Sequence, residues 1–205
     1  MASIIQRVST SSRGGQRPRI IDFLAHWRAE ITATVCLILV VEDFALGFKP
    51  HDLADFRDPQ ALAGLVLVLF GLMVRSWAAG TLQSETELTM AGPYSLVRHP
   101  LYAGSFTMMI GFAIIIDDPE NIWIVFGPIL FLYMIRIQRD ERRMSQSFGA
   151  RWQEYARATP PFFPRRLSRR ALGGWRLNQW IGNGEYRFTG PTLLGLVALK
   201  LWHML

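Results

Sequence analysis

Apolar residues are concentrated in five stretches of the 205-residue chain, with shorter polar segments between them. These stretches cover residues 31–48, 61–80, 101–116, 122–137 and 189–205. A helix needs about 20 apolar residues to cross a bilayer, so the third and fourth stretches are marginal on their own. The acidic, proline-containing turn between them, at residues 117–121, favours a tight helical hairpin that supports both. The pattern predicts an all-α, multi-pass transmembrane protein with about five spanning helices. A buried hairpin of a soluble protein is the weaker alternative.

Composition strengthens the membrane interpretation. Half of the residues are hydrophobic and 19% are charged, whereas a soluble domain typically carries about 25% charged residues. The net charge of +6 does not indicate nucleic acid here, because basic residues of an apolar chain typically mark cytoplasmic loops and contacts with lipid headgroups. We therefore expect membrane lipids, and no nucleic acid, as partners. The single cysteine, Cys36, excludes an internal disulfide.

Basic residues are unevenly distributed between the two ends of the apolar stretches. Residues 1–28 form an arginine-rich tail, and a second run of arginines follows the fourth stretch, whereas the turn at 117–121 holds only acidic charges. Because positively charged loops stay in the cytoplasm, the tail and the segment after residue 137 are predicted to be cytoplasmic. Residues 29–205 are expected to form one membrane domain that ends in a helix at 189–205. We predict no signal peptide.

The predicted hairpin would bring two polar groups of residues together at the cytoplasmic face. One is a proline-flanked turn at 92–104, and the other is the end of the fourth helix at 136–141. They contain the side chains Tyr94, Arg98, His99, Tyr102, Arg136, Arg139, Asp140 and Glu141. Polar groups at the depth where a chain enters lipid are costly and usually line a functional cavity. For residues 136–143 alone, a solvated helix end is an equally good interpretation.

Two sequence blocks resemble the isoprenylcysteine carboxyl methyltransferase family of integral membrane methyltransferases, including its bacterial relatives. The first block is Leu-Thr-Met-Ala-Gly-Pro-Tyr at 88–94 followed by Val-Arg-His-Pro-Leu-Tyr-Ala-Gly at 97–104. The second block runs from 136 to 164 and contains Asp140-Glu141, Phe148-Gly149, Trp152, Tyr155, Thr159-Pro160 and Phe163-Pro164. The resemblance covers residues 86–164, and the order and spacing of the two blocks make it specific.

The resemblance implies S-adenosylmethionine as the cofactor, bound in a cytoplasmic pocket that opens to lipid and is covered by the C-terminal region. The residues that match the cofactor shell are Thr86, Glu87, Leu88, Thr89, Tyr94, His99, Pro100, Leu101, Tyr102 and Asp140. The resemblance gives Arg136 a contact with the acceptor, and Glu141 matches the second acid of the family's pair. The chain has Thr86-Glu87 where eukaryotic members often have histidine, which weakens the case for prenylcysteine as the acceptor.

The predicted function is methyl transfer to a lipophilic or amphipathic acceptor, with carboxyl O-methylation favoured. A carboxylate acceptor needs no base, and Arg136 would hold it by paired hydrogen bonds with help from Arg98. An amine must lose a proton, and Glu141 or His99 would then be the candidate base. A phospholipid amine N-methyltransferase is therefore an alternative. A nicotinamide-dependent membrane reductase of the sterol reductase type is another, because residues 149–155 fit the Gly-x-x-Trp-x-x-Tyr step of those enzymes.

Four smaller features complete the predictions. His26, His51 and His203 lack ligand spacing, so we expect no metal site. Arg75 is expected to extend from its helix to the cytoplasmic interface rather than to face the pocket. Pro128 is expected to kink the fourth helix. The segment 165–188 mixes tryptophans with arginines and is predicted to lie at the membrane interface, with a role in covering the pocket as the alternative.

Overall fold

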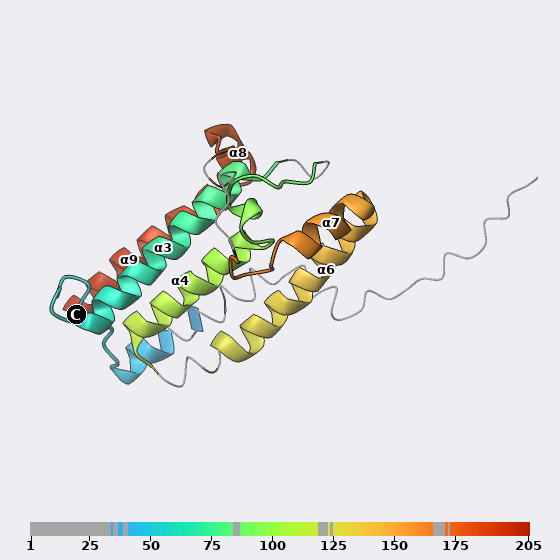
Figure 1. The fold of residues 1–205 in the computed structure, drawn as a ribbon. Coiled ribbons are helices and arrows are strands. Elements are labelled where there is room, and N and C mark those ends of the chain that lie inside the picture. The colour runs from blue at the N-terminus through green and yellow to red at the C-terminus, as the bar shows by residue number, and fades with distance from the viewer. Residues whose placement is uncertain are drawn as a thin grey trace, which may run out of the picture.

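The computed structural model describes residues 34, 37–38, 41–83, 87–118, 123, 125–165, 171 and 173–205. Every regular element in these ranges is helical, which confirms the all-α prediction for this part of the chain (Figure 1). The elements are α3 (Pro59–Thr81), the 3-10 turn η1 (Gly92–Ser95), α4 (Pro100–Ile116), the π-helical turn η2 (Val125–Ile129), α6 (Leu130–Phe148), α7 (Ala150–Ala158), α8 (Leu177–Gly182) and α9 (Tyr186–Met204).

The apolar stretches predicted at 61–80, 101–116 and 189–205 are confirmed as α3, α4 and α9. The starts of the first two helices follow from local sequence. Asp58 caps α3 by accepting hydrogen bonds from the backbone N–H groups of Gln60 and Ala61, and a proline occupies the first position of each helix. The first predicted stretch, 31–48, lies largely outside the described residues, although residues 41–46 are helical.

The most closely packed pair of helices is α3 and α4, which run antiparallel (Figure 1). Glycines spaced seven residues apart make this contact possible. A Cβ added at Gly71 would lie 2.6 Å from the Gly104 carbonyl oxygen, and one added at Gly64 would lie 2.8 Å from the Gly111 carbonyl oxygen. The prediction of a tight hairpin between 101–116 and 122–137 is therefore corrected. In the structure α4 and α6 are joined by side chains at one end, where the cavity described below lies.

The fourth predicted helix differs from the prediction at both ends. Residues 119–122 and 124 lie outside the described part, and Pro128 sits within the π-helical turn η2 instead of an α-helical kink. Beyond residue 137, α6 continues for three more turns because residues 138–148 are mostly good helix formers such as Gln, Arg, Glu and Met. It ends at Gly149, whose φ of +53° suits glycine, and the chain then turns into α7.

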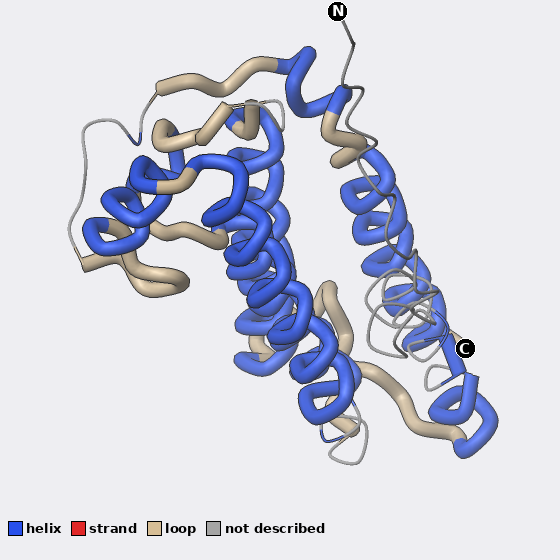
Figure 2. The backbone as a smooth tube through the Cα atoms, turned by 90° about the vertical axis from the view of Figure 1, so that its right-hand side faces the viewer, coloured by secondary structure: helices blue, strands red, loops and turns tan. Residues whose placement is uncertain are grey.

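Helix α9 packs against α3 and α4 to complete the core. Val68 of α3, Ile115 of α4, and Leu196, Leu199 and Trp202 of α9 form one buried cluster. Figure 2 shows that the axes of the long helices are roughly aligned and that the loops lie at the helix ends. Among the described helices, α3 alone is both long and apolar enough to cross a membrane, while α4 is apolar but has 17 residues.

Candidate functional site

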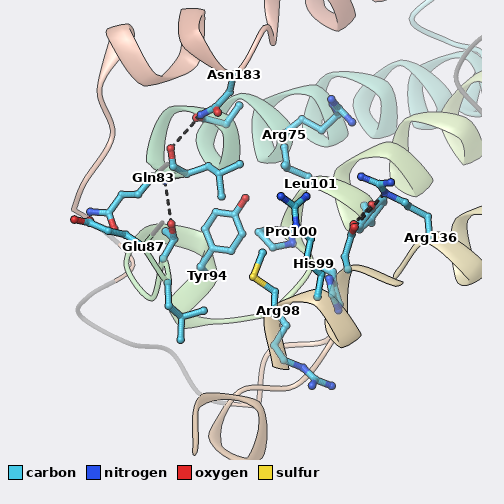
Figure 3. A pocket seen from close by; sticks show the side chains of 18 of the residues that line it. Arg75, Gln83, Glu87, Tyr94, Arg98, His99, Pro100, Leu101, Arg136 and Asn183 are labelled. Carbon is cyan, nitrogen blue, oxygen red and sulfur yellow. Dashed lines mark hydrogen bonds and ion pairs between the residues drawn. The ribbon is translucent and has the colours of Figure 1, made fainter. Parts of the chain in front are cut away.

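A cavity of about 500 Å³ lies where α4 begins and the second half of α6 passes it (Figure 3). The predicted residues that line it are Glu87, Leu88, Thr89, Tyr94, Arg98, His99, Pro100, Leu101, Tyr102, Arg136 and Asp140. Thr86 lies outside the described residues. Glu141 does not line the cavity and instead lies behind Arg98 and His99. The structure therefore brings the two sequence blocks to one cavity.

The first block contains a tight turn that requires glycine at position 92. Gly92 has a φ of +60°, and a Cβ there would lie 2.5 Å from a side-chain carbon of Thr81. Pro93 then starts the turn η1, and the Ser95 hydroxyl donates a hydrogen bond back to the Gly92 carbonyl oxygen at 2.8 Å. This closed turn holds Tyr94 with its ring pointing into the cavity (Figure 3).

The second block supports the first through backbone hydrogen bonds. The N–H of Arg98 donates to the Pro160 carbonyl at 2.8 Å, and the N–H of His99 donates to the Pro161 carbonyl at 3.1 Å. The Tyr155 hydroxyl donates to the Tyr94 carbonyl at 2.7 Å. The proline-containing segment after α7 therefore fixes the entry to α4, and the two distant motifs form one structural unit.

Tyr94 has the polar atom most clearly available to a ligand. Its side chain is buried and lines the cavity, yet its hydroxyl has no hydrogen-bond partner among the described residues. Burial raises the pKa of Tyr94 far above its ordinary value, so the hydroxyl keeps its proton and remains a donor. A buried hydroxyl without a partner is costly and usually has a partner that binds from outside the protein.

Asp140 is held between two side chains. Its Oδ2 accepts a hydrogen bond from the Tyr102 hydroxyl at 2.6 Å, and its Oδ1 lies 3.1 Å from the Arg136 Nε one turn earlier in α6. Asp140 and Arg136 are about one quarter and one third exposed, at 26% and 33%, and both line the cavity. The hydrogen bond between Tyr102 and Asp140 links α4 to α6, and the Arg136–Asp140 pair leaves a cation and an acceptor facing the same space.

Glu141 orients the residues on the other side of the turn. Its Oε1 lies 3.2 Å from Arg98 Nη1 and 2.9 Å from His99 Nε2. Burial lowers the pKa of His99, although the Glu141 carboxylate acts against this shift. His99 is therefore neutral near pH 7. Because the Glu141 carboxylate accepts a hydrogen bond, the neutral imidazole carries its proton on Nε2. The other ring nitrogen, Nδ1, is then unprotonated.

The cavity also contains an ion pair that the sequence did not reveal. The Arg75 Nε and Nη2 donate to the two carboxylate oxygens of Glu185, each at 2.9 Å, and Arg75 Nη1 donates to the Ser105 hydroxyl at 2.6 Å. Arg75 and Glu185 both line the cavity and are buried. The prediction that Arg75 extends to the interface is wrong, because its charge is neutralised inside the protein.

Sequence signals for this pair exist but are weak. An arginine within an apolar helix is expected either to reach the interface or to find a buried partner. Glu185 is the only acidic residue after Glu154, in a segment otherwise rich in arginine. Neither observation predicts that Arg75 pairs with Glu185, which lies 110 positions later in the chain. The segment predicted to lie at the interface contributes Asn183 and Glu185 to the cavity, so the alternative role of this segment in covering the pocket has structural support.

The described residues offer no cluster of metal ligands. No group of three or more His, Cys, Asp or Glu side chains there is arranged to hold a metal ion. Two polar clusters lie at the opposite end of the helices. One joins His51 to Asp58 and Asp117, and the other joins Lys200 to Asp52.

A known protein family matches the central part of the chain. The protein-family model described as phospholipid methyltransferase matches residues 59–151, from the start of α3 to the start of α7. The turn 92–104 and Arg136–Glu141 are inside the match, whereas Trp152, Tyr155 and Glu185 are outside it.

Several curated proteins are similar to the chain. The nickel-cobalt-cadmium resistance protein NccN of Alcaligenes xylosoxydans xylosoxydans is 32% identical over 70% of this chain and 68% of its own length. The cobalt-zinc-cadmium resistance protein CzcN of Cupriavidus metallidurans is 28% identical over 83% and 79%. A probable protein-S-isoprenylcysteine O-methyltransferase of Oryza sativa subsp. indica is 27% identical over 64% and 80%. No solved structure matches the chain.

Proposed function

Because the chain belongs to the phospholipid methyltransferase family, which includes isoprenylcysteine O-methyltransferases, we propose that it transfers a methyl group from S-adenosylmethionine to a lipophilic acceptor at a membrane. The observation that carries the proposal is the meeting of both sequence blocks at one cavity, with the unpartnered Tyr94 hydroxyl inside it. The volume of about 500 Å³ lies within the range of roughly 300–1,000 Å³ that is typical of ligand pockets.

The residues present fit the chemical groups of S-adenosylmethionine. Its carboxylate suits the N-terminus of α4, where the N–H groups of Leu101 and Tyr102 have no intrahelical partner. Its ammonium and ribose hydroxyls suit carboxylate acceptors such as Glu87 and Asp140. The Tyr94 hydroxyl supplies a further donor. When bound, the cofactor would supply an electrophilic methyl group on a sulfonium.

The chain itself contributes binding and alignment. Arg136 and Arg98 both line the cavity, and each is fixed by an acid, Asp140 for Arg136 and Glu141 for Arg98. Guanidinium groups held in this way can orient a carboxylate by paired hydrogen bonds without reorganising. Glu141 lies outside the lining and is occupied by two lining residues, Arg98 and His99, so we assign it to positioning rather than to proton transfer. This arrangement favours a carboxylate acceptor, which needs no base.

An amine acceptor is the second candidate, and His99 is the observation that favours it. The imidazole lines the cavity, and its lowered pKa keeps it neutral and able to accept a proton at Nδ1. The description of the matching family, phospholipid methyltransferase, is consistent with an amine of a lipid headgroup. Both candidates use the same cavity and differ in the bond that is formed.

We further propose that the protein crosses the membrane several times with this cavity on the cytoplasmic side. Support comes from the outer face of α3, where large apolar side chains are exposed at helical spacing. They are Leu62, Val66, Leu69, Phe70 and Met73. Helix α9 exposes Leu194, Val197 and Leu201 in the same way. Lipid would cover these faces, and an acceptor dissolved in lipid would be close to the cavity.

The test uses membranes that contain the full-length chain and a cofactor labelled on its methyl group. Lipids are extracted after the reaction and treated with base. Label that base releases indicates a methyl ester, and label that survives indicates an N-methylated lipid. Arg136→Met is the matched variant and is expected to lose most ester formation. Membranes that transfer no label, together with heat protection of the purified chain by a nicotinamide cofactor but not by S-adenosylhomocysteine, would contradict the proposal.

A further inference from the structure

The segment of residues 173–188, here called the C-terminal extension, lies beyond the part of the chain that the family model matches. It nevertheless forms part of the cavity, because Asn183, Glu185 and Phe188 line it. Figure 3 shows Asn183 hydrogen-bonded to the chain beside the cavity. The extension is therefore a wall that the family-matched residues do not provide.

Backbone contacts tie the extension to the last turn of α3. The Arg176 N–H donates to the Gly80 carbonyl at 2.7 Å, and the Asn183 side-chain amide donates to the Ala79 carbonyl at 2.8 Å. These carbonyls belong to the end of the helix, where intrahelical donors run out. The extension thus takes the place of a helix cap.

The ring of Trp175 occupies space that is open only because residue 80 is glycine. A Cβ at Gly80 would lie 2.0 Å from the Trp175 Nε1, and this nitrogen donates to the Ser76 carbonyl at 3.1 Å. The contact fixes the start of the extension against α3. The other end of the extension needs a separate attachment.

That attachment is the ion pair between Arg75 and Glu185. Both carboxylate oxygens of Glu185 accept from the guanidinium, Ser105 accepts a third hydrogen bond, and the Phe188 ring lies 4.1 Å from the guanidinium carbon. Glu185 is 2% exposed. A buried ion pair contributes little net stability over apolar residues, but removal of one partner leaves a buried charge without compensation. The pair therefore selects one position of the extension.

We propose that Arg75 and Glu185 are positioning residues that fasten the C-terminal extension over the cavity as its wall, so that a ligand in the cavity holds the extension in place and the extension encloses the ligand. The inference rests on the proposed function for the identity of the ligand. The attachment of the C-terminal extension by Arg75 and Glu185 is independent of the proposed function.

The test is limited digestion of the full-length chain in detergent by trypsin, with cleavage after Arg176 and Arg187 followed by mass spectrometry. Both arginines are exposed, but cleavage requires the local backbone to open. Glu185→Gln and Arg75→Met are expected to raise cleavage at these sites on the order of 100-fold, because each leaves a buried group unpaired. Cleavage after Arg157 in α7 serves as the internal reference.

Lys200→Met is the matched control. It removes the ion pair of α9 with Asp52, at the far end of that helix, and is expected to leave cleavage of the extension unchanged. The conservative variant Glu185→Asp keeps the charge with a shorter reach and is expected to give an intermediate rate. Glu185→Asp also provides a folded variant if Glu185→Gln does not fold.

Ligand dependence separates a wall of the cavity from a purely structural contact. Saturating S-adenosylhomocysteine is expected to slow cleavage of the wild-type extension about tenfold, and to slow it less in Glu185→Gln. Equal cleavage of wild type and Glu185→Gln would overturn the inference, as would wild-type cleavage that bound S-adenosylhomocysteine does not change. If calorimetry shows that S-adenosylhomocysteine does not bind, the proposed function fails, and the unliganded cleavage rates alone decide the attachment.

Discussion

Some polar side chains around the cavity have all their hydrogen-bond and ion-pair partners within the protein, and others do not. Asp140 and Glu141 each have two partners, and the buried carboxylate of Glu185 is fully paired with Arg75. The hydroxyl of Tyr94 has none in the described structure. A buried donor that the described residues leave without an acceptor is prepared for a ligand that brings one.

Replacement of Tyr94 by phenylalanine is expected to have opposite effects on the empty and loaded protein. Without ligand, the free energy of unfolding should stay the same or rise by about 1 kcal/mol, because an unpaired buried hydroxyl is removed. With S-adenosylhomocysteine, affinity should fall about tenfold through loss of one hydrogen bond. Thermal unfolding and calorimetry measure the two quantities.

Tyr155→Phe is the matched control for that variant, since the two tyrosines lie in the same region. Its hydroxyl is bonded to the Tyr94 carbonyl, so its removal should lower the free energy of unfolding by about 1 kcal/mol. If Tyr94→Phe destabilised the empty protein as much as Tyr155→Phe does, the Tyr94 hydroxyl would have a partner inside the protein and the argument would be wrong.

His99 is expected to make stability depend on pH. Its folded pKa lies below its ordinary value of about 6.5, mainly because of burial. The unfolded chain then binds more protons than the folded chain between the two pKa values, so stability is complete above about pH 6.5 and is lost as the pH falls below it. Thermal midpoints measured from pH 7.5 to 5 should fall less steeply for His99→Gln than for wild type. Equal slopes would contradict the lowered pKa.

Sequence reasoning located the cavity residues that lie in short motifs and missed those that depend on long-range packing. Tyr94, His99 and Asp140 were predicted from their motifs, and all three line the cavity. Arg75 and Glu185 carry no motif. Their pairing depends on how the C-terminal extension meets α3, which neither local pattern nor charge distribution specifies.

At the level of helices, the α3–α4 pair forms the rigid base of the site. Backbones approach closely only where both helices carry glycine, and four glycines lie at the contact: Gly64, Gly71, Gly104 and Gly111. Because α4 begins at the turn that carries the site, its position against α3 also sets the position of His99 and of the residues that follow.

Gly71→Ala is expected to be strongly destabilising. The new Cβ would lie 2.6 Å from the Gly104 carbonyl oxygen, and a backbone atom of a packed helix cannot move away as a flexible side chain would. Overpacking of this kind costs about 1–3 kcal/mol, and we expect the upper end in the free energy of unfolding. Binding of S-adenosylhomocysteine should weaken as well, because α4 shifts.

The control for that variant is Gly195→Ala in α9, where an added Cβ meets only carbons of the Phe112 ring, at 3.7 and 3.8 Å, which is ordinary van der Waals contact. Alanine is favoured over glycine inside a helix by about 1 kcal/mol, so this change should be neutral or stabilising. Denaturant titration of both variants separates a specific contact from a general effect of helix propensity. A Gly71→Ala protein as stable as wild type would show that the two helices are farther apart than described here.

Periodicity and composition predicted α3, α4 and α9 well, because each is an apolar stretch with clear polar ends. They did not predict which helices form the close pair. The turn at 117–121 suggested pairing of neighbouring stretches, but the glycines of α3 and α4 allow a closer approach than α4 and α6 achieve. The sequence pattern also did not predict that α6 continues to Phe148. The apolar residues end at residue 137, whereas residues with high helix propensity continue beyond it.

For the whole molecule, charge distribution and helix directions support the arrangement in a membrane that we propose. The cavity lies at the end of the helices where arginines of α6 and α7 gather, such as Arg143 and Arg151. The opposite end carries the loop of residues 48–58, with Asp52 and Asp58 engaged by Lys200 and His51. Of the described helices only α3 is both long and apolar enough to cross a membrane, and the proposal of several crossings predicts which side of the membrane each loop occupies.

Two cysteine positions test this prediction. In a Cys36→Ser background, Ala54→Cys lies in the exposed loop before α3, and Ser147→Cys lies at the exposed end of α6. Three crossings between them would put the two positions on opposite sides, with residue 147 in the cytoplasm beside the arginine-rich segment. A membrane-impermeant maleimide should therefore label Ala54→Cys in right-side-out vesicles and Ser147→Cys in inverted ones. Labelling of both positions from the same side would contradict three crossings, whereas a reversed pattern would keep the crossings and move the cavity to the outer face.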